Sequence, residues 1–497
     1  MQHIGRNIIS LIFSRVSSGI VLFLIYTRLA QYLGPEAAGQ YGLLAAYVTV
    51  FNFFIDLGMS QLVIKKISED RTNSSKYLSN YFTVQAILAV LFMLIMDFSV
   101  LLSNYPVYVK NALYVAGFGL LISTLSLPAR SVISAFQRLT VIAKVNFFNA
   151  LINAVMMVLA IVFRQNILFL SFISVSVGLF DFIVYSYLVN KNFTPFKFSF
   201  DKVFIKQLFI WTFPFTLLTF FSVYNRVDTL LLSNLRSFVE TGYYSAAYKF
   251  WDTLAFLPAV IGVSLYPFFA EQLSKGRLDN VKSGLETYTR YMIALAVPLS
   301  VGAFMLSEKI TLSFYGPNFA PASNALWLLV VAVSLLIIYS PVNSLIISQL
   351  TKTATKITGF NLLYNITANL ILIPKFGFVA AAAVTVGSEL IQTIGYTYIV
   401  KKRIVNFTFF RYFIKPIIAV MGMAVVISML KNYNVWLVVA IGGVVYLVIL
   451  LAIRFFHKQD WDMFKSAIDI RRDINKTDFP SPCLPAEVLT KAGEGRD

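Results

Sequence analysis

The sequence contains little charge for its size, and basic residues dominate that charge. Of its 497 residues only 13% are charged and 58% are hydrophobic, whereas soluble proteins have about 25% charged and about 45–50% apolar residues. This composition excludes a soluble enzyme, a disordered chain and a nucleic-acid-binding domain as first interpretations. It is typical of a membrane protein with many transmembrane helices.

Cysteine and histidine are nearly absent. The single cysteine, Cys483, cannot form an internal disulfide, and the two histidines, His3 and His457, stand at opposite ends of the chain. We therefore predict no disulfide framework and no zinc or di-metal centre. Motifs such as GxSxG, a phosphate-binding glycine loop and HExxH are also missing, so we predict no enzymatic activity. No cofactor is expected beyond a driving ion, H⁺ or Na⁺.

Long apolar runs predict an all-α polytopic membrane protein. A helix of about 20 apolar residues crosses a bilayer, and the runs are bounded by charges or by glycine and proline. Fourteen spans are predicted at residues 8–31, 39–63, 78–103, 110–135, 141–163, 166–189, 206–234, 239–269, 287–307, 322–350, 354–374, 377–400, 411–430 and 433–455. We divide the chain into an N-terminal lobe at 1–200, a C-terminal lobe at 201–405, two further helices at 406–456 and a partly disordered tail at 457–497.

The basic residues predict the orientation. Of the 41 lysines and arginines, thirty lie at the termini and in the loops on one side, and seven lie in the opposite loops. Cytoplasmic loops are enriched in lysine and arginine. We therefore predict a cell-membrane protein with both termini in the cytoplasm.

Two sequence echoes predict that the lobes are repeats. Gly39-Gln40-Tyr41 matches Gly242-Tyr243-Tyr244, about two hundred residues later. Pro128, Ser131, Asn149 and Asn153 are echoed in the same order by Pro341, Ser344, Asn361 and Asn365. Six spans separate each element from its copy. An even number preserves orientation, so the repeat is parallel, with its axis along the membrane normal.

Basic residues inside apolar spans are costly, and they mark functional sites. Four lysines and arginines lie within the predicted spans: Arg15, Arg130, Arg226 and Lys249. Together with Arg28, at the outer end of the first span, they are predicted to bind an anionic group of the substrate. Two acids, Asp228 and Asp252, are the alternative partners of Arg226 and Lys249. We expect partial pairing in the empty state and transfer of the basic groups to the substrate.

Acids within the spans are predicted to bind the driving ion. The candidates are Asp56, Asp228 and Asp252, because a carboxylate in a low-dielectric medium can carry a proton or ligate sodium. Pairing with Arg15 or Arg226 is the structural alternative. Three other acids within spans receive no predicted role: Asp97, Asp181 and Glu389.

Asparagines recur at a spacing of four residues, which places them on one helix face. The two sets are Asn149 with Asn153 in the fifth span, and Asn361 with Asn365 and Asn369 in the eleventh. Such stripes either hold helices together by hydrogen bonds or line a polar cavity. As cavity residues, Asn149, Asn153, Asn361 and Asn365 are predicted to contact the substrate.

Four segments together resemble the oligosaccharide flippases of the polysaccharide-transport family, in the multidrug/oligosaccharidyl-lipid/polysaccharide (MOP) superfamily. The segments are "TRLAQYLGPEAAGQYGL", "DLGMSQLVIKK", "NRVDTLLLSNLRSFVETGYYSAAYKF" and "SFYGPNFAPASNALWLL". The resemblance implies two six-helix lobes and two terminal helices around a central cavity. In related lipid II flippases, arginines of the first and eighth helices contact the diphosphate. This chain has Arg15 and Arg28 on its first helix and Lys249 on its eighth.

The resemblance implies that an isoprenoid diphosphate-linked glycan moves from the inner to the outer leaflet by alternating access, driven by an ion gradient. The expected partners are that glycolipid, the bilayer and other polysaccharide-assembly membrane proteins, without nucleic acid. We expect the protein to be a monomer. The competing interpretations are a cation-coupled multidrug exporter of the same superfamily and a purely structural membrane protein.

Overall fold

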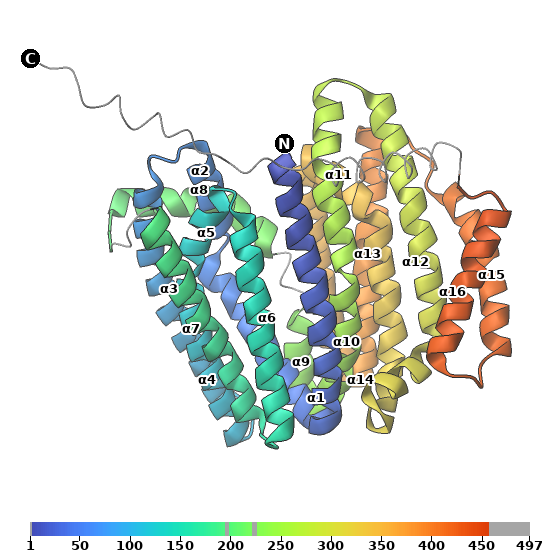
Figure 1. Ribbon diagram of the computed structural model, residues 1–497, viewed down its shortest axis with the longest axis horizontal. Helices are drawn as coiled ribbons and strands as arrows, with labels where there is room; N and C mark the ends of the chain where they lie inside the picture. Colours follow the sequence, from blue (N-terminus) through green and yellow to red (C-terminus); the bar gives the residue numbers. More distant parts are fainter. Residues whose placement is uncertain (1, 194–197, 221–225, 457–497) are drawn as a thin grey trace, which may run out of the picture.

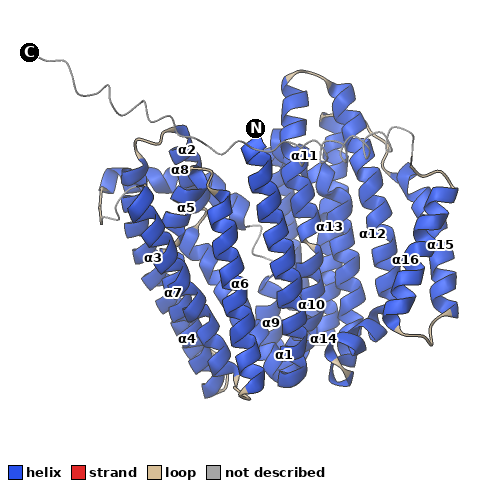
Figure 2. Cartoon of the chain, viewed as in Figure 1, coloured by secondary structure: helices blue, strands red, loops and turns tan. Residues whose placement is uncertain are grey.

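The computed structural model describes the backbone of residues 2–193, 198–220 and 226–456. The side chains of residues 2–18, and of a few positions between 214 and 352, lie outside this description. The predicted tail at 457–497 also lies outside the described residues. All secondary structure in the described ranges is helical, in agreement with the predicted fold class (Figure 2).

Sixteen α-helices and two short 3-10 helices occur in the described residues. The α-helices are α1 (Gln2–Asp56), α2 (Met59–Glu69), α3 (Ser74–Leu102), α4 (Val107–Leu125), α5 (Leu127–Ala135), α6 (Leu139–Val162), α7 (Ile167–Asn192), α8 (Lys202–Phe220), α9 (Val227–Leu235), α10 (Phe238–Leu254), α11 (Phe256–Ser274), α12 (Leu278–Tyr315), α13 (Ser323–Gln349), α14 (Thr351–Arg403), α15 (Ile414–Met429) and α16 (Val435–Ala452). The 3-10 helices are η2 (Pro317–Ala322) and η3 (Phe410–Phe413).

Glycine kinks divide the two longest helices. Ten of the described stretches are long and apolar enough to cross a membrane. Two of them, in α1 and α14, contain a non-helical residue: Gly34 with φ 74° and Gly377 with φ 62°. Glycine adopts this left-handed backbone readily because it has no Cβ. Gly34 falls between the predicted spans 8–31 and 39–63, and Gly377 is the first residue of the span 377–400, so α1 and α14 each hold two predicted spans.

Four predicted spans are interrupted: 39–63 between α1 and α2, 110–135 between α4 and α5, and also 206–234 and 239–269. Within 206–234, α8 and α9 lie on either side of residues 221–225, which are outside the description. Within 239–269, α10 and α11 meet at Ala255. Pro258 stands in the first turn of α11, where its missing N–H breaks no helical hydrogen bond. Apart from 221–225, the predicted spans coincide almost throughout with described helices.

The helices form two groups that share α1. Figure 1 shows α2 to α8 at one side, α10 to α14 at the other, and α15 and α16 at the outer edge beyond α12. α1 packs against α6 of the first group and α10 of the second. The predicted boundaries at 200 and 405 fall in the connections before α8 and after α14. We call the end of the bundle that carries Lys65, Lys202, Lys275 and Lys401 the basic face.

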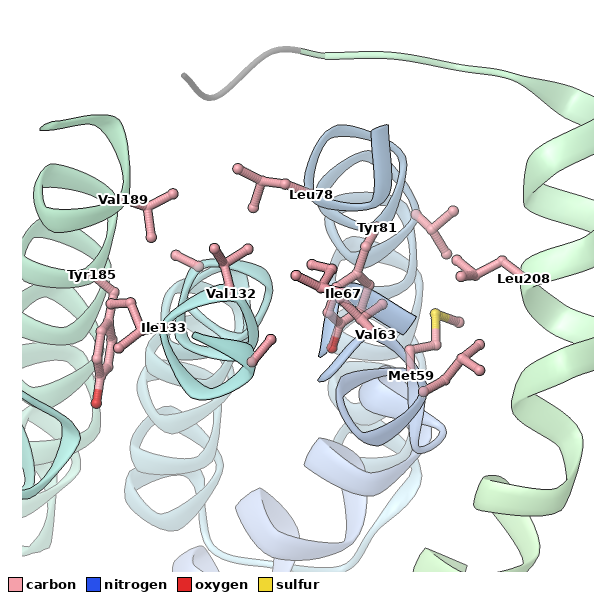
Figure 3. Packing of buried hydrophobic residues seen from close by; sticks show 14 of the residues in the cluster. Met59, Val63, Ile67, Leu78, Tyr81, Val132, Ile133, Tyr185, Val189 and Leu208 are labelled. Atoms are coloured by element: carbon pink, nitrogen blue, oxygen red, sulfur yellow. The ribbon is translucent and has the colours of Figure 1, made fainter. Parts of the chain in front are cut away.

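Apolar side chains fill the interior of each group and also cover much of its outside. Met59, Val132 and Leu208 belong to a buried cluster that joins α2, α5 and α8 near the basic face (Figure 3). On the outer side of α3, Leu94 and Phe98 remain exposed. A lipid-facing helix can expose such residues because its backbone polar groups are satisfied internally.

The first sequence echo forms a close helix contact. A Cβ added to Gly39 would overlap the carbonyl oxygen of Phe238, and one added to Gly242 would overlap that of Pro35. The two glycines therefore allow α1 and α10 to touch backbone to backbone at the end opposite the basic face. Small residues at helix crossings permit such close packing in membranes.

We predict that Gly39→Ala destabilises the protein, because the new methyl group has no room at this contact. Overpacking of this kind costs about 1–3 kcal/mol, so the thermal unfolding temperature of the purified protein should fall. Gly302→Ala in α12 is the matched control, since no atom lies within 4 Å of the added Cβ. An unchanged unfolding temperature for Gly39→Ala would contradict the close contact.

Candidate functional site

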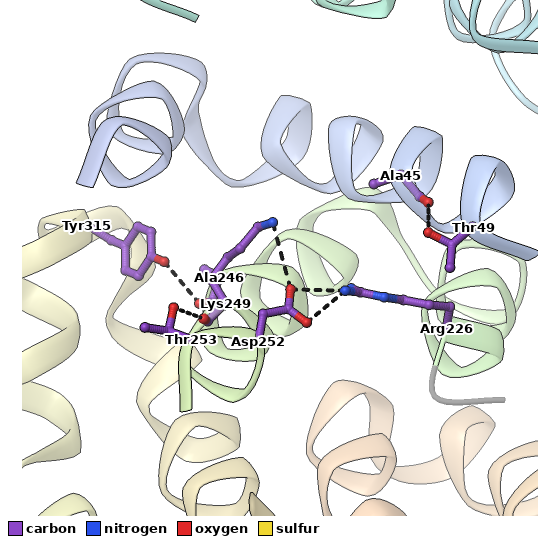
Figure 4. Close-up of polar contacts among 8 residues, drawn as sticks. All are labelled: Ala45, Thr49, Arg226, Ala246, Lys249, Asp252, Thr253 and Tyr315. Atoms are coloured by element: carbon purple, nitrogen blue, oxygen red, sulfur yellow. Dashed lines mark hydrogen bonds and ion pairs between the residues drawn. The ribbon is translucent and has the colours of Figure 1, made fainter. Parts of the chain in front are cut away.

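Three charged side chains from α9 and α10 converge inside the bundle (Figure 4). Arg226, the residue before α9, donates from Nη2 to both carboxylate oxygens of Asp252, at 2.8 and 2.9 Å. The Nζ atom of Lys249 lies 3.8 Å from Oδ2 of the same carboxylate. Lys249 and Asp252 share one face of α10, because they are three residues apart. The carboxylate of Asp252 therefore interacts with two cations.

Aromatic rings support both cations. The guanidinium of Arg226 lies 4.6 Å from the ring centre of Tyr248, and the Lys249 ammonium lies 4.8 Å from that of Tyr26 on α1. A cation over a tyrosine face is stabilised by the ring quadrupole. The rings are buried, but Arg226, Asp252 and Lys249 keep 27%, 32% and 35% of their side-chain surface exposed. The cluster therefore presents accessible charge beside α1.

The cluster has an excess positive charge. Asp252 balances one of its two cations, so an anion placed between Arg226 and Lys249 would complete the neutralisation. A guanidinium offers a planar fork that matches a carboxylate or phosphate. The alternative in which Asp228 balances Arg226 does not occur in this conformation. The carboxylate of Asp228 contacts other groups, because α9 turns it away from the cluster.

An apolar groove adjoins the charged cluster. Its volume is about 390 Å³, and residues of α10, α12, α13, α15 and α16, with Phe23 of α1, line it. Phe250, the neighbour of Lys249 in the chain, is among the lining residues. Charge and apolar surface therefore lie next to each other, on two sides of α10.

Asp228 lies in a buried polar network. Its side chain is 1% exposed and accepts hydrogen bonds from Asn369 at 2.7 Å, Tyr244 at 3.1 Å and Thr385 at 3.3 Å. Among the described residues, no lysine or arginine lies within ion-pair distance. The donors come from α10 and α14, and all are neutral. An ionised Asp228 therefore needs a cation to balance its charge.

The asparagine stripe of α14 belongs to the same network. Asn361, Asn365 and Asn369 are at most 1% exposed. The side-chain amide of Asn369 donates to Oδ1 of Asn365, and the Nδ2 atom of Asn365 donates to the hydroxyl of Ser388. The Oδ1 atom of Asn369 is buried and has no hydrogen-bond partner among the described residues. Asn361 and Asn365, predicted to contact the substrate, are enclosed by protein in this conformation.

Asp56 lies apart from the cluster, at the turn between α1 and α2. Its carboxylate accepts hydrogen bonds from the backbone and hydroxyl of Ser60 and from the hydroxyl of Tyr81. Leu57 and Gly58, with φ values of 49° and 80°, interrupt the helix there. The carboxylate therefore satisfies the backbone at the start of α2, which is a structural role.

The predicted substrate residues of the first lobe form a separate group. Asn149 donates to Asp181 at 2.8 Å, and Asn153 donates to the carbonyl oxygen of Asn149. Arg130 of α5 is within electrostatic range of Asp181. It forms no ion pair with any described residue. These side chains are half-buried and are brought together by α5, α6 and α7.

Arg28 of the first helix lies apart from the cluster. Arg28 is exposed, donates to Gln31 and lines a cavity of about 550 Å³ with Phe314 and Trp436. The side chain of Arg15 lies outside the described residues.

Several residues of the two sites carry no clear sequence signal. Tyr26, Tyr248 and Thr385 resemble the many other apolar or aromatic positions of the spans, and only the packing of α1, α10 and α14 reveals their contacts. The described residues contain no group of three or more histidine, cysteine, aspartate or glutamate side chains that could hold a metal ion.

Comparison with known proteins identifies the family. The sequence model of a family described as "Polysaccharide biosynthesis protein" matches residues 4–273, more than half of the chain. The chain belongs to this polysaccharide biosynthesis protein family. It is a multi-pass membrane protein.

Two archaeal proteins resemble this family member in sequence. An uncharacterized membrane protein of Methanocaldococcus jannaschii, MJ1068, is 23% identical over 278 residues, 53% of this chain and 54% of that protein. A probable flippase of Haloferax volcanii, AglR, is 26% identical over 176 residues, 34% of this chain and 37% of its own length. The chain thus aligns with about half of the first relative and less of the second.

Solved structures share the fold. The lipid II flippase MurJ in an inward closed conformation matches with a TM-score of 0.73 at 18% identity, covering 90% of this chain and 99% of MurJ. An inward-facing multidrug resistance MATE transporter of the MOP superfamily matches with a TM-score of 0.62 at 10% identity, covering 78% of this chain and 97% of that one. At these identities the likeness concerns the fold.

Proposed function

We propose that this protein is a flippase that moves an isoprenoid diphosphate-linked oligosaccharide from the inner to the outer leaflet by alternating access. The supporting observation is the cluster of Arg226, Lys249 and Asp252 next to the apolar groove. A cargo with an anionic head and a long apolar tail matches both surfaces. Such a protein makes and breaks no covalent bond, so we propose a transporter and not an enzyme.

The charge of the cluster suits a diphosphate. A diphosphate cannot enter dry hydrocarbon, because the loss of its hydration is too costly. Charge-assisted hydrogen bonds from Arg226 and Lys249 would replace that hydration. Asp252 holds the two cations together in the empty state and would release them as the diphosphate enters.

The groove suits the isoprenoid tail. Its walls are almost entirely apolar, and it runs between α10 and the outer helices α12, α15 and α16. A tail seated there would remain beside Phe250 while the head contacts Lys249. The isoprenoid would thus leave the lipid only along part of its length.

The multidrug exporter is the second candidate, because the MATE transporters share this fold. An organic cation would be repelled by a cluster of two cations and one acid, and this favours the flippase.

The asparagines and Arg130 of the first lobe are suited to hydrogen-bond sugars, and we propose that Arg130, Asn149 and Asn153 contact the glycan.

Transport should depend on the cationic cluster. In a strain that lacks its own flippase, we expect Arg226→Ala and Lys249→Ala to lower surface glycan by at least about tenfold, which corresponds to 1.4 kcal/mol. Arg226→Lys should retain part of the activity, because the charge survives without the bidentate fork. Arg164→Ala, in an exposed loop, is the matched control. Wild-type glycan levels in both alanine variants would refute the mechanism, and drug resistance without surface glycan would favour the exporter.

We propose that Asp228 binds the driving ion. A buried carboxylate without a basic partner needs a proton or a metal cation. The amide of Asn369 contacts Asp228 through its nitrogen, and its buried Oδ1 atom has no hydrogen-bond partner among the described residues. H⁺ and Na⁺ are both compatible with these ligands. Asp252 already balances two cations and Asp56 caps a turn, so neither is assigned this role.

Asp228→Asn should uncouple transport from the ion gradient. The amide has nearly the same shape but carries neither a charge nor an exchangeable acidic proton. In vesicles, glycolipid movement by this variant should not respond to an imposed proton or sodium gradient. Asp97→Asn on α3 is the control, because it also neutralises an acid within a helix. A full gradient response in Asp228→Asn would remove Asp228 from coupling.

We also propose that the basic face is cytoplasmic and that the protein lies in the cell membrane. In a Cys483→Ser background, cysteines introduced at Asn104 and Asn318 should react with an impermeant thiol reagent in intact cells. Both positions are exposed, as is Ser274 at the basic face. Ser274→Cys should react only after permeabilisation. The reverse pattern would invert the orientation.

A further inference from the structure

Glu389 is a second buried acid that the proposed mechanism leaves unused. It lies on α14 and is 2% exposed. Its Oε2 atom accepts a hydrogen bond from the hydroxyl of Tyr339 on α13, at 2.9 Å. No described lysine or arginine lies within ion-pair distance of it. An unpaired carboxylate inside a membrane helix bundle is costly, so such residues commonly carry a function.

The hydroxyl hydrogen of Tyr339 can bond to either of two acceptors at this site. The hydroxyl of Tyr339 faces two acceptors, Oε2 of Glu389 at 2.9 Å and Oε1 of Gln392 at 3.1 Å. A hydroxyl has only one hydrogen to donate. If Glu389 is ionised, Tyr339 donates to it and turns away from Gln392. If Glu389 is protonated, it donates to the Tyr339 oxygen, and Tyr339 donates to Gln392.

The site is connected to Asp228 through α14. Thr385, which donates to Asp228, lies one turn before Glu389 and on the same helix face. Ser388, next to Glu389 in the chain, accepts the hydrogen bond from Asn365, which in turn accepts one from Asn369. Buried polar side chains therefore lead from Asp228 to the turn of α14 that carries Glu389.

The polar set also extends toward the basic face. Gln392 and Tyr396 follow Glu389 on α14, and both are buried. The Tyr396 hydroxyl is 2.7 Å from that of Thr358, and its ring packs edge-on against Tyr339 at 5.8 Å. These hydroxyl and amide groups provide hydrogen-bonding positions between Glu389 and Lys401, where α14 reaches the basic face.

Three tyrosines lie around Glu389: Tyr339 of α13, Tyr396 of α14 and Tyr248 of α10. The other titratable group on this side is Asp228 of α9, which accepts a hydrogen bond from Thr385, one turn of α14 away. Tyr248 lies within electrostatic range of both acids, and its ring also carries the guanidinium of Arg226. When a diphosphate neutralises Arg226, the field at the two acids changes through this shared neighbour.

We propose that Glu389 is a proton-binding site that gains and loses a proton during the transport cycle, with Tyr339 switching its hydrogen bond between Glu389 and Gln392. On release, the carboxyl O–H bond breaks, the proton passes to water, and the Tyr339 hydrogen returns to the carboxylate. On uptake the steps reverse. This role rests on the proposed function and adds a second ion-binding residue to Asp228.

Infrared difference spectroscopy on the protein in lipid vesicles tests the site without any glycan. A rise in pH should remove a protonated-carboxyl band from the wild-type spectrum, and Glu389→Gln should lack that band. Tyr339→Phe should shift the band, because it loses its hydrogen-bond partner. Tyr185→Phe is the matched control: Tyr185 is equally buried and its hydroxyl has no partner among the described residues. A band that persists in Glu389→Gln, or that never responds to pH, would refute the proposal.

A transport assay in the same vesicles tests the role in coupling. Stimulation of glycolipid movement by a proton gradient should fall about tenfold in Glu389→Gln, within the range of typical coupling free energies. Asp97→Asn should keep the full stimulation. Equal stimulation in Glu389→Gln and wild type would overturn the coupling role. If the wild type moves no glycolipid at all, the proposed function fails, and the infrared result still decides whether Glu389 exchanges a proton.

Discussion

The balance of charge inside an apolar helix bundle is the constraint on which the rest of this structure depends. Two cations, Arg226 and Lys249, share the single carboxylate of Asp252. The shared acid reduces the cost of keeping them within the membrane, and the remaining positive charge creates an affinity for an anion. A fully neutralised cluster would be easier to bury, but it would have less affinity for an anionic head group.

The packing of two consecutive helices brings these charges together. Arg226 stands at the start of α9, and Asp252 lies in the last turn of α10, just before the break at Ala255. α9 and α10 pack against each other, so the beginning of one helix lies beside the end of the other. The groove lies on the other side of α10. Its lining residue Phe250 directly follows Lys249 of the charged cluster in the sequence.

The second lobe combines this accessible charge with fully enclosed acids. Asp228 and Glu389 receive hydrogen bonds from neutral side chains, whereas Asp252 contacts cations. Acidic side chains therefore occupy two kinds of environment within one lobe. Tyr248 lies within electrostatic range of all three acids, and its ring also contacts Arg226, so charge at the cluster can influence the buried acids.

The sequence alone determined the helical membrane fold, the spans and the charged positions, because apolar length and the cost of buried charge are local properties of the chain. It also paired Gly39 with Gly242 as an echo, although only the packing of α1 on α10 revealed that the two touch. The partner of Arg226, the enclosure of Asn361 and Asn365, and the capping role of Asp56 were decided by tertiary structure. These features depend on which helix faces meet. The spacing of residues along a helix shows which of them share a face, but it does not show whether that face contacts a cavity, a neighbouring helix or a turn.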